Sequence, residues 1–99
     1  MRRAAKVDAN HAAVREAFKK CGCTVLDTFT LGKGAPDMVV AKNRQTWLVE
    51  VKDGDKPISK QRLTQDQEAF FAEWRGFMFV VNDYKQGPRI VDFMMGDEK

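Results

Sequence analysis

Apolar residues recur along the chain at two spacings, one typical of α-helices and the other typical of β-strands. Near the start, Val14, Ala17, Phe18 and Cys21 stand three or four positions apart, as on one face of a helix. We therefore expect a helix over residues 10–21. Lysines occupy its last turn, where positive charge favours the helix dipole, and a glycine follows that can end the helix.

Five further segments are rich in β-branched and aromatic residues, which favour strands. They cover residues 23–30, 37–41, 46–52, 77–81 and 89–95. The polar residues 42–45 predict a turn, so that the second and third strands form a hairpin. A turn over residues 84–88 precedes the last strand.

A second helix is expected over residues 65–74. Thr64 can cap its first turn, and Gln67 can return the hydrogen bond as the partner in a capping box. The element order is then αβββαββ, which predicts an α/β fold with a mixed sheet flanked by helices. A chain of 99 residues suffices for a single domain over residues 1–99, with flexible ends at 1–7 and 96–99.

Charge and composition narrow the function classes. The formal net charge of +3 is a mild bias towards anionic partners. No apolar run approaches the ~20 residues that span a membrane, and the polar first residues do not form a signal peptide. Cys21, Cys23 and His11 supply too few ligands for a zinc site, and reduced thiols suit a cytoplasmic protein.

The end of the predicted hairpin carries charged residues in an apolar surrounding. Strand side chains alternate, so Glu50 and Lys52 point to one face and Val49 and Val51 to the other. Burying an acid and a base is costly unless they are paired or have a task. The hairpin can also bring Asp37 close to Glu50, because the start of one antiparallel strand opposes the end of the other.

These charged residues favour one kind of chemistry. Two neighbouring carboxylates repel each other, and a divalent cation relieves that repulsion. A bound metal ion can activate water and neutralise a phosphate under attack, while the ammonium of Lys52 can stabilise oxyanions. The trio therefore points to phosphodiester hydrolysis. A surface salt bridge between Glu50 and Lys52, with Asp37 as a plain turn residue, explains the same residues equally well.

The motifs around this trio resemble a known family. Pro36-Asp37, separated by a strand and a turn from Glu50-Val51-Lys52, is similar to the PD-(D/E)XK nuclease signature. More narrowly, the chain resembles the stand-alone VRR-NUC domains of bacteria and phages. The motifs that carry this resemblance are GAPDMVV at residues 34–40, LVEVKDG at residues 48–54, LTQDQ at residues 63–67 and DAN at residues 8–10.

The resemblance implies a restriction-endonuclease-like fold and a Mg²⁺ or Mn²⁺ ion held by Asp37, Glu50 and the main-chain carbonyl of Val51. Lys52 would be the catalytic lysine. It further implies a homodimeric DNA endonuclease that cleaves branched DNA, such as the four-way Holliday junction, in the cytoplasm of a bacterium or a phage-infected cell. A non-catalytic nucleic-acid-binding module on the same fold is the alternative, and an interaction domain without a DNA role is a weaker one.

One position departs from the family pattern. Relatives often carry a Glu in the first helix near the metal, and Ala13 stands at that position in the alignment we favour. Glu16 is the nearest substitute, but at ~100° per residue it falls on the solvent side of the helix. Asn10 lies closer to the buried face and could bind a metal-bound water or a phosphate. The number of metal ions per site, one or two, is therefore open.

Supporting residues surround the motif. Gln67 falls in the apolar stripe of its helix, so it points into the active site, completes the capping box, or does both. Loop residues that could contact DNA phosphates, or simply be solvated, are Lys33, Lys56, Ser59, Lys60 and Arg62. His11 is expected on the helix surface rather than as a general base. Aromatic residues expected in the core or in a dimer interface are Trp47, Phe70, Phe71 and Trp74.

Overall fold

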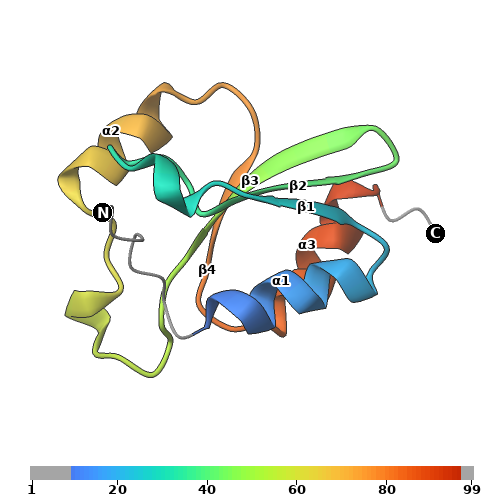
Figure 1. Ribbon diagram of the computed structural model, residues 1–99, viewed down its shortest axis with the longest axis horizontal. Helices are drawn as coiled ribbons and strands as arrows, with labels where there is room; N and C mark the ends of the chain where they lie inside the picture. The colour runs from blue at the N-terminus through green and yellow to red at the C-terminus, as the bar shows by residue number, and fades with distance from the viewer. Residues whose placement is uncertain (1–9, 97–99) are drawn as a thin grey trace, which may run out of the picture.

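The computed structural model describes residues 10–96. Within them the helices are α1 (His11–Lys20), α2 (Gln65–Glu73) and α3 (Gln86–Met94), and the strands are β1 (Thr24–Asp27), β2 (Met38–Lys42), β3 (Gln45–Val51) and β4 (Met78–Val81) (Figure 1). Two short 3₁₀ helices lie in the connections, η1 (Phe29–Leu31) and η2 (Ile58–Lys60). Of the end segments expected to be flexible, 1–7 and 96–99, all but Gly96 lie outside the described residues.

The strands form one mixed sheet in the order β1-β2-β3-β4. β2 is antiparallel to both β1 and β3, whereas β4 runs parallel to β3. The turn between β2 and β3 places Asn43 (φ 50°) and Arg44 (φ 69°) in the left-handed region, the two-residue geometry that suits the twist of a hairpin. The expected α/β class, mixed sheet and hairpin are therefore confirmed.

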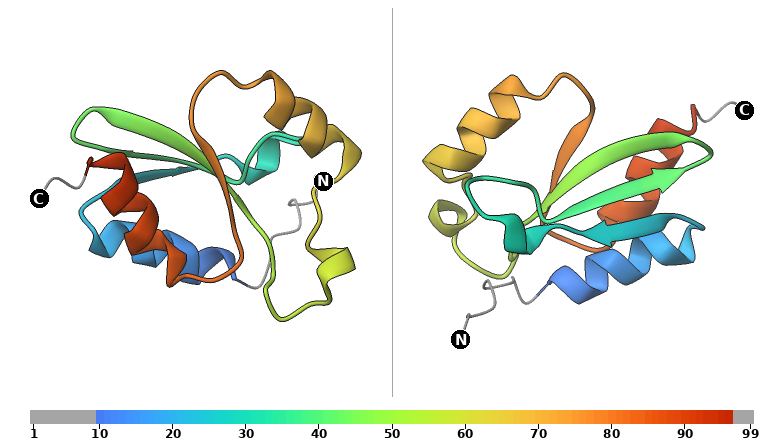
Figure 2. Two further views of the ribbon diagram at one scale, coloured as in Figure 1. Left: turned by 180° about the vertical axis from the view of Figure 1, so that it is seen from behind. Right: turned by 45° about the horizontal axis from the view of Figure 1, so that its top comes forward.

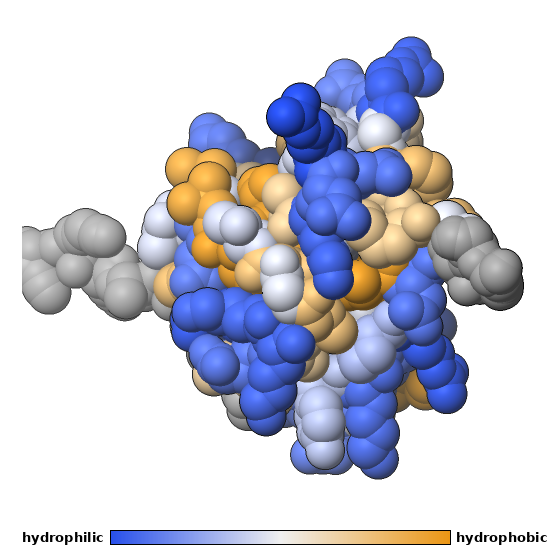
Figure 3. Space-filling view, turned by 90° about the vertical axis from the view of Figure 1, so that its right-hand side faces the viewer, coloured by the Kyte–Doolittle hydropathy of each residue, from blue (hydrophilic) through white to orange (hydrophobic). Residues whose placement is uncertain are grey.

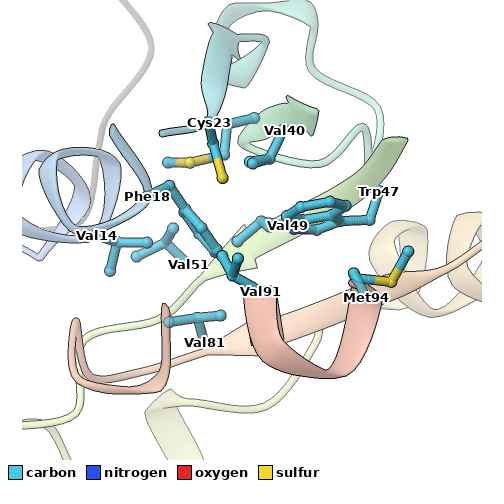
Figure 4. Close-up of a cluster of buried hydrophobic side chains, with 11 residues drawn as sticks. Val14, Phe18, Cys23, Val40, Trp47, Val49, Val51, Val81, Val91 and Met94 are labelled. Carbon is cyan, nitrogen blue, oxygen red and sulfur yellow. The ribbon is translucent and has the colours of Figure 1, made fainter. Parts of the chain in front are cut away.

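α1 and α3 pack side by side against one face of the sheet, while α2 stands apart from them (Figures 1 and 2). Trp47 is fully buried in the core between these layers, as expected, and meets Phe18 edge-on (Figure 4). Val49 and Val51 also belong to this core. Because strand side chains alternate, Glu50 faces the opposite side of β3.

The remaining aromatic residues of the sequence analysis lie on α2 or at its end. Phe70 and Phe71 are half-buried, and Trp74 is exposed and stacks on Phe70. The turn of the β2–β3 hairpin faces the viewer in Figure 3, where hydrophilic and hydrophobic side chains are interspersed. Within residues 10–96, no helix has the length and apolar character needed to cross a membrane.

The start of α2 has the expected capping box. The hydroxyl of Thr64 accepts the N–H of Gln67 (3.2 Å), and Oε1 of Gln67 accepts the N–H of Thr64 (2.9 Å). The loop before β2 packs against this helix start: a Cβ on Gly34 (φ +82°) would lie 2.3 Å from the carbonyl oxygen of Asp66. Only glycine permits so close an approach of two backbones.

β1 is shorter than the strand expected over residues 23–30. It ends at Asp27, and Thr28 then bonds to the segment that leads into β2. The hydroxyl of Thr28 donates to the carbonyl of Pro36 (2.7 Å), and its N–H donates to the carbonyl of Asp37 (2.8 Å). These bonds hold the segment that contains Pro36 and Asp37 against the end of β1. After Thr28 the chain forms η1, although the residues of this segment favour a strand.

The last strand expected, over residues 89–95, is wrong, because this segment belongs to helix α3. The residues that the helix buries stand four and three positions apart, which is a helical period: Gly87, Val91 and Met94. Pro88 lies in the first turn, where its missing N–H costs no helix bond. A Cβ on Gly87 would lie 3.2 Å from Cβ of Ala17, so the glycine lets α3 pack closely on α1.

Candidate active site

The hairpin brings Asp37 to the end of β3. Asp37 directly precedes β2, and its N–H donates to the carbonyl of Val49 (3.0 Å). Its carboxylate Oδ2 accepts the N–H of Val51 (2.7 Å), so the carboxylate lies against β3. Because the N–H and C=O of a strand residue point to the same edge, the carbonyl of Val51 also faces the side on which Asp37 lies.

Glu50 and Lys52 lie on the face of β3 away from the main core. Both are buried, with exposed fractions of 3% and 8%, and Nζ of Lys52 lies 3.6 Å from Oε2 of Glu50. The explanation of this motif as a surface salt bridge is therefore wrong. A buried ion pair needs further hydrogen bonds to offset its lost hydration, and the start of α2 supplies them.

Gln67 joins this ion pair to α2. Its Nε2 donates to Oε2 of Glu50 (2.8 Å), and its Oε1 accepts from Nζ of Lys52 (2.8 Å). The same Oε1 also accepts the N–H of Thr64 in the capping box. The sequence left open whether Gln67 caps its helix or points towards the charged residues. Its side chain does both: it caps α2 and bonds to Glu50 and Lys52.

Burial and a second carboxylate raise the pKa of Glu50. Burial raises the pKa of this carboxyl from 4.5 to about 8, with the neighbouring Asp37 carboxylate adding to the rise and Lys52 opposing it. Oε1 of Glu50 is buried without a hydrogen-bond partner among the described residues. A carboxylate oxygen without a hydrogen-bond partner, next to a second carboxylate, is a favourable ligand for a hard divalent cation.

The oxygen atoms present fit such a cation. Within residues 10–96, no three His, Cys, Asp or Glu side chains group as metal ligands. The ligand set would thus be the carboxylates of Asp37 and Glu50 and the main-chain carbonyl of Val51, completed by water. Mg²⁺ and Mn²⁺ accept such all-oxygen sets, and Mg²⁺ commonly keeps several waters.

Asn10 fastens the start of α1 to the ends of the two parallel strands. Its side-chain amide donates to the carbonyls of Lys52 (2.9 Å) and Asn82 (2.8 Å). Both amide hydrogens are thus used inside the protein, and Oδ1 is the atom left for the predicted contact with water or phosphate. In α1, Ala13 and Glu16 are exposed, so the helix brings no carboxylate to the trio, as expected.

The loop residues predicted to contact DNA are all exposed, and the structure places them in the connections before and after β2 and β3: Lys33, Lys56, Ser59, Lys60 and Arg62. Gln61 holds the second connection in place. Its Nε2 donates to the carbonyl of Lys56 (2.7 Å), and its Oε1 accepts from Nδ2 of Asn82 (2.9 Å). Sequence analysis missed this anchor, because a single Gln in a polar loop forms no pattern. Contact with DNA stays a prediction.

His11 is not on the helix surface, so that expectation is wrong. It is 4% exposed, its Nε2 lies 2.9 Å from Oδ1 of Asp27, and its ring meets Phe29 edge-on. Asp27 pairs with Met38, a core residue, so His11 lies on the helix-covered face. It therefore stabilises the contact between α1 and β1 rather than entering the candidate site.

The mixed four-stranded sheet with helices packed against it is compatible with the restriction-endonuclease-like class of folds. A solved structure described as a VRR_NUC domain matches the chain with a TM-score of 0.56 and 30% sequence identity, over 83% of this chain and 89% of that one. The chain belongs to the VRR-NUC family. No family model matches it, and neither does any curated protein.

Proposed function

We propose that the protein is a metal-dependent endonuclease that hydrolyses phosphodiester bonds of DNA. The observation that carries the proposal is the pair of adjacent carboxylates, Asp37 and Glu50, with a buried oxygen left bare beside a lysine held by Gln67. A protein gains nothing in stability from this arrangement in the absence of a cation, since it buries charges at a cost. The cost suits a site built for catalysis.

Each residue has a role in this proposal. Asp37, Glu50 and the carbonyl of Val51 hold Mg²⁺ or Mn²⁺, which when bound neutralises phosphate charge and makes water a better nucleophile. Lys52 places its ammonium, fixed by Gln67 at 2.8 Å, where negative charge develops on the phosphate oxygens or on the attacking water. Gln67 fixes the side chains of Lys52 and Glu50 relative to each other.

In this proposal, the half-buried Asn10 and five exposed loop residues bind the DNA backbone: Lys33, Lys56, Ser59, Lys60 and Arg62. Phosphate contacts of this kind fix the position of DNA without reading its sequence. Selectivity then comes from DNA shape. From the family resemblance, we propose branched DNA, such as a four-way junction, as the substrate and a cytoplasmic homodimer as the enzyme.

The proposal is tested by cleavage of a four-way junction, a flap and a linear duplex, each with Mg²⁺, with Mn²⁺ or with a chelator. We expect metal-dependent cutting that is strongest on branched DNA and is lost in Glu50→Ala and Lys52→Ala. Glu16→Ala is the matched control, because it removes an exposed acid of α1. Full activity in both active-site variants rules out this site.

A second candidate is a nucleic-acid-binding module without catalysis. The observation that favours it is the lack of a carboxylate from α1, since Ala13 and Glu16 face solvent. Tight binding of all three DNAs without any cutting in Mg²⁺ or Mn²⁺ would support this candidate. Titration calorimetry of metal binding, with Asp37→Asn as control, distinguishes one ion per site from two or none.

A further inference from the structure

Two strongly exposed aliphatic side chains lie in the same loops as the candidate DNA-binding lysines. Ile58, in η2, is 74% exposed, and Leu31, at the end of η1, is 68% exposed. Among residues 10–96, no other large apolar side chain has so great an exposed fraction. A single exposed aliphatic residue is ordinary on a protein surface, but these two, the apolar tips, both stand beside residues assigned to DNA phosphates.

Both loops meet at the start of helix α2, which holds the candidate active site. The loop after Leu31 packs against this helix, because Gly34 lies against the backbone of Asp66. The loop that carries Ile58 leads directly into the helix. η1, η2 and α2 accordingly lie at one end of the molecule, opposite the β2–β3 turn (Figures 1 and 2). The same helix start holds the charged residues of the site through Gln67.

The length of the chain limits the distance from each apolar tip to the site. Leu31 is six residues before Asp37, and Ile58 is six residues after Lys52. Because an extended chain covers at most ~3.6 Å per residue, the Cα atom of each tip lies within roughly 22 Å of that of an active-site residue. One DNA strand rises about 3.4 Å per nucleotide. Both tips therefore reach bases within about six nucleotides of a phosphate bound at the site.

The loop that presents Ile58 is held in one shape by internal bonds. Pro57 fixes the backbone before it, and the carbonyl of Pro57 accepts the N–H of Lys60 (2.8 Å). The carbonyl of Ile58 accepts the N–H of Gln61 (2.9 Å), whose side chain donates to the carbonyl of Lys56 (2.7 Å). A side chain on such a preorganised loop loses little conformational entropy when it binds.

The loop that presents Leu31 is fixed as well. The N–H of Leu31 donates to the carbonyl of Thr28 (3.1 Å), and the N–H of Ala35 donates to that of Gly32 (3.1 Å). Lys33 is held in the left-handed region at φ 55°, a conformation that costs free energy in a residue with a side chain. Such strain persists where the surroundings fix the backbone, and it is common at functional sites.

We propose that Ile58 and Leu31 insert between unstacked bases at the branch point of the DNA. This inference rests on the proposed endonuclease and names the feature of the substrate that it recognises. Proteins that kink DNA insert aliphatic side chains between base steps and pay the free energy of unstacking. At a branch point the stacking is already interrupted, so insertion costs less there than in a linear duplex. The apolar tips thereby favour branched DNA.

The charges around the apolar tips favour DNA over a protein partner. Three cations and one acid, Asp55, stand within four positions of Ile58, and Lys33 follows Leu31 by two positions. Lysine is depleted in protein–protein interfaces, whereas lysine and arginine neutralise DNA phosphates. Phosphate contacts on either side of each tip position it over the bases.

A fluorescent base analogue tests the insertion. 2-Aminopurine is quenched in stacked DNA and brightens when it is unstacked. It is placed in turn at successive nucleotides around the branch point of a four-way junction, with Ca²⁺ in place of Mg²⁺ to keep the DNA intact. We expect saturating wild-type protein to raise the fluorescence severalfold at one or more of these positions, and not at the matching positions of a linear duplex.

Variants at exposed residues show which side chains cause the rise. Leu31→Ser/Ile58→Ser abolishes the fluorescence rise and lowers the preference for junction over duplex by about tenfold in dissociation constant, whereas Ile58→Leu keeps both. Lys60→Ala weakens binding of both DNAs and lowers the salt dependence, but it keeps the rise at saturating protein. Phe93→Ser removes a side chain that is 60% exposed on α3. It is the control and matches the wild type.

Each other outcome overturns a defined part of the proposal. An equal rise in the wild type and the double serine variant overturns the insertion. A lower mass of that variant in light scattering does so too, because it places the tips in a protein interface. Cutting in Mg²⁺ without a rise in Ca²⁺ overturns the insertion alone and leaves the nuclease intact. A rise without cutting overturns the nuclease and supports the insertion, and a failure to bind DNA overturns both.

Discussion

Gln67 holds Lys52 through the same oxygen that caps helix α2. Oε1 of Gln67 lies 2.8 Å from Nζ of Lys52 and 2.9 Å from the backbone nitrogen of Thr64. The position of the lysine in the candidate site is thus coupled to the start of a helix. Catalysis and helix stability are therefore separable only by changes that affect one of these bonds.

The first prediction separates the two functions of Gln67. Thr64→Ala removes the N-cap hydroxyl and lowers the free energy of unfolding by about 1 kcal/mol, with little effect on cleavage. Gln67→Ala leaves Lys52 and Glu50 without their shared partner and lowers the cleavage rate by about 10- to 100-fold. Denaturant unfolding and single-turnover cleavage measure the two effects. Equal cleavage rates for both variants would contradict the role of Gln67 in the site.

The second prediction concerns the charge of Lys52. Lys52→Met keeps the length of the side chain and removes its ammonium, so cleavage falls by about 10²–10³-fold because transition-state charge is no longer stabilised. DNA binding, measured by fluorescence anisotropy in Ca²⁺, changes little. Lys19→Met is the control, since it removes an exposed ammonium in the last turn of α1. Loss of binding with unchanged cleavage at saturating protein would contradict a catalytic role.

The third prediction is a pH dependence of stability in the metal-free protein. Burial raises the pKa of Glu50 from 4.5 to about 8, so the folded protein binds this proton more tightly than the unfolded chain. The stabilisation is fully present below about pH 4.5 and is lost as the pH rises through 8. At about 1.4 kcal/mol per pKa unit, we expect the metal-free protein to lose roughly 5 kcal/mol across this window through Glu50.

Melting curves in a chelator at pH 5 and pH 8 measure this effect. Glu50→Gln stays neutral throughout, so it is more stable than the wild type at pH 8 and the difference narrows at pH 5. Adding Mg²⁺ at pH 8 raises the melting temperature of the wild type and not that of Glu50→Gln. Parallel stability profiles of the two proteins would refute the raised pKa.

The fourth prediction distinguishes structure from DNA contact at Asn10. Asn10→Ala leaves the carbonyls of Lys52 and Asn82 without a donor, which costs about 1–3 kcal/mol in the free energy of unfolding. Lys33→Ala, at an exposed residue, leaves stability unchanged but lowers the slope of log binding constant against log salt by about one. Unfolding curves and salt titrations check both. An unchanged stability of Asn10→Ala would assign Asn10 to DNA contact instead.

Sequence alone determined the features that depend on near neighbours. The spacing of Val14 and Phe18 defines α1, because a helical face repeats within a few residues. The capping box of Thr64 and Gln67 is read within four positions. Strand alternation places Glu50 and Lys52 together, and the hairpin delivers Asp37, because each step involves residues close in the chain or paired across one turn.

The tertiary structure decided what depends on distant contacts. Helix α3 forms where β-branched residues favour a strand, because packing against α1 at Gly87 rewards a helical face. His11 is buried because β1 supplies Asp27 as its partner. The local pattern leaves open whether Glu50 and Lys52 are exposed or buried, because their burial depends on Gln67 of α2, which lies 17 and 15 positions further along the chain. Sequence thus determined which groups stand together, and packing decided their burial and therefore their chemistry.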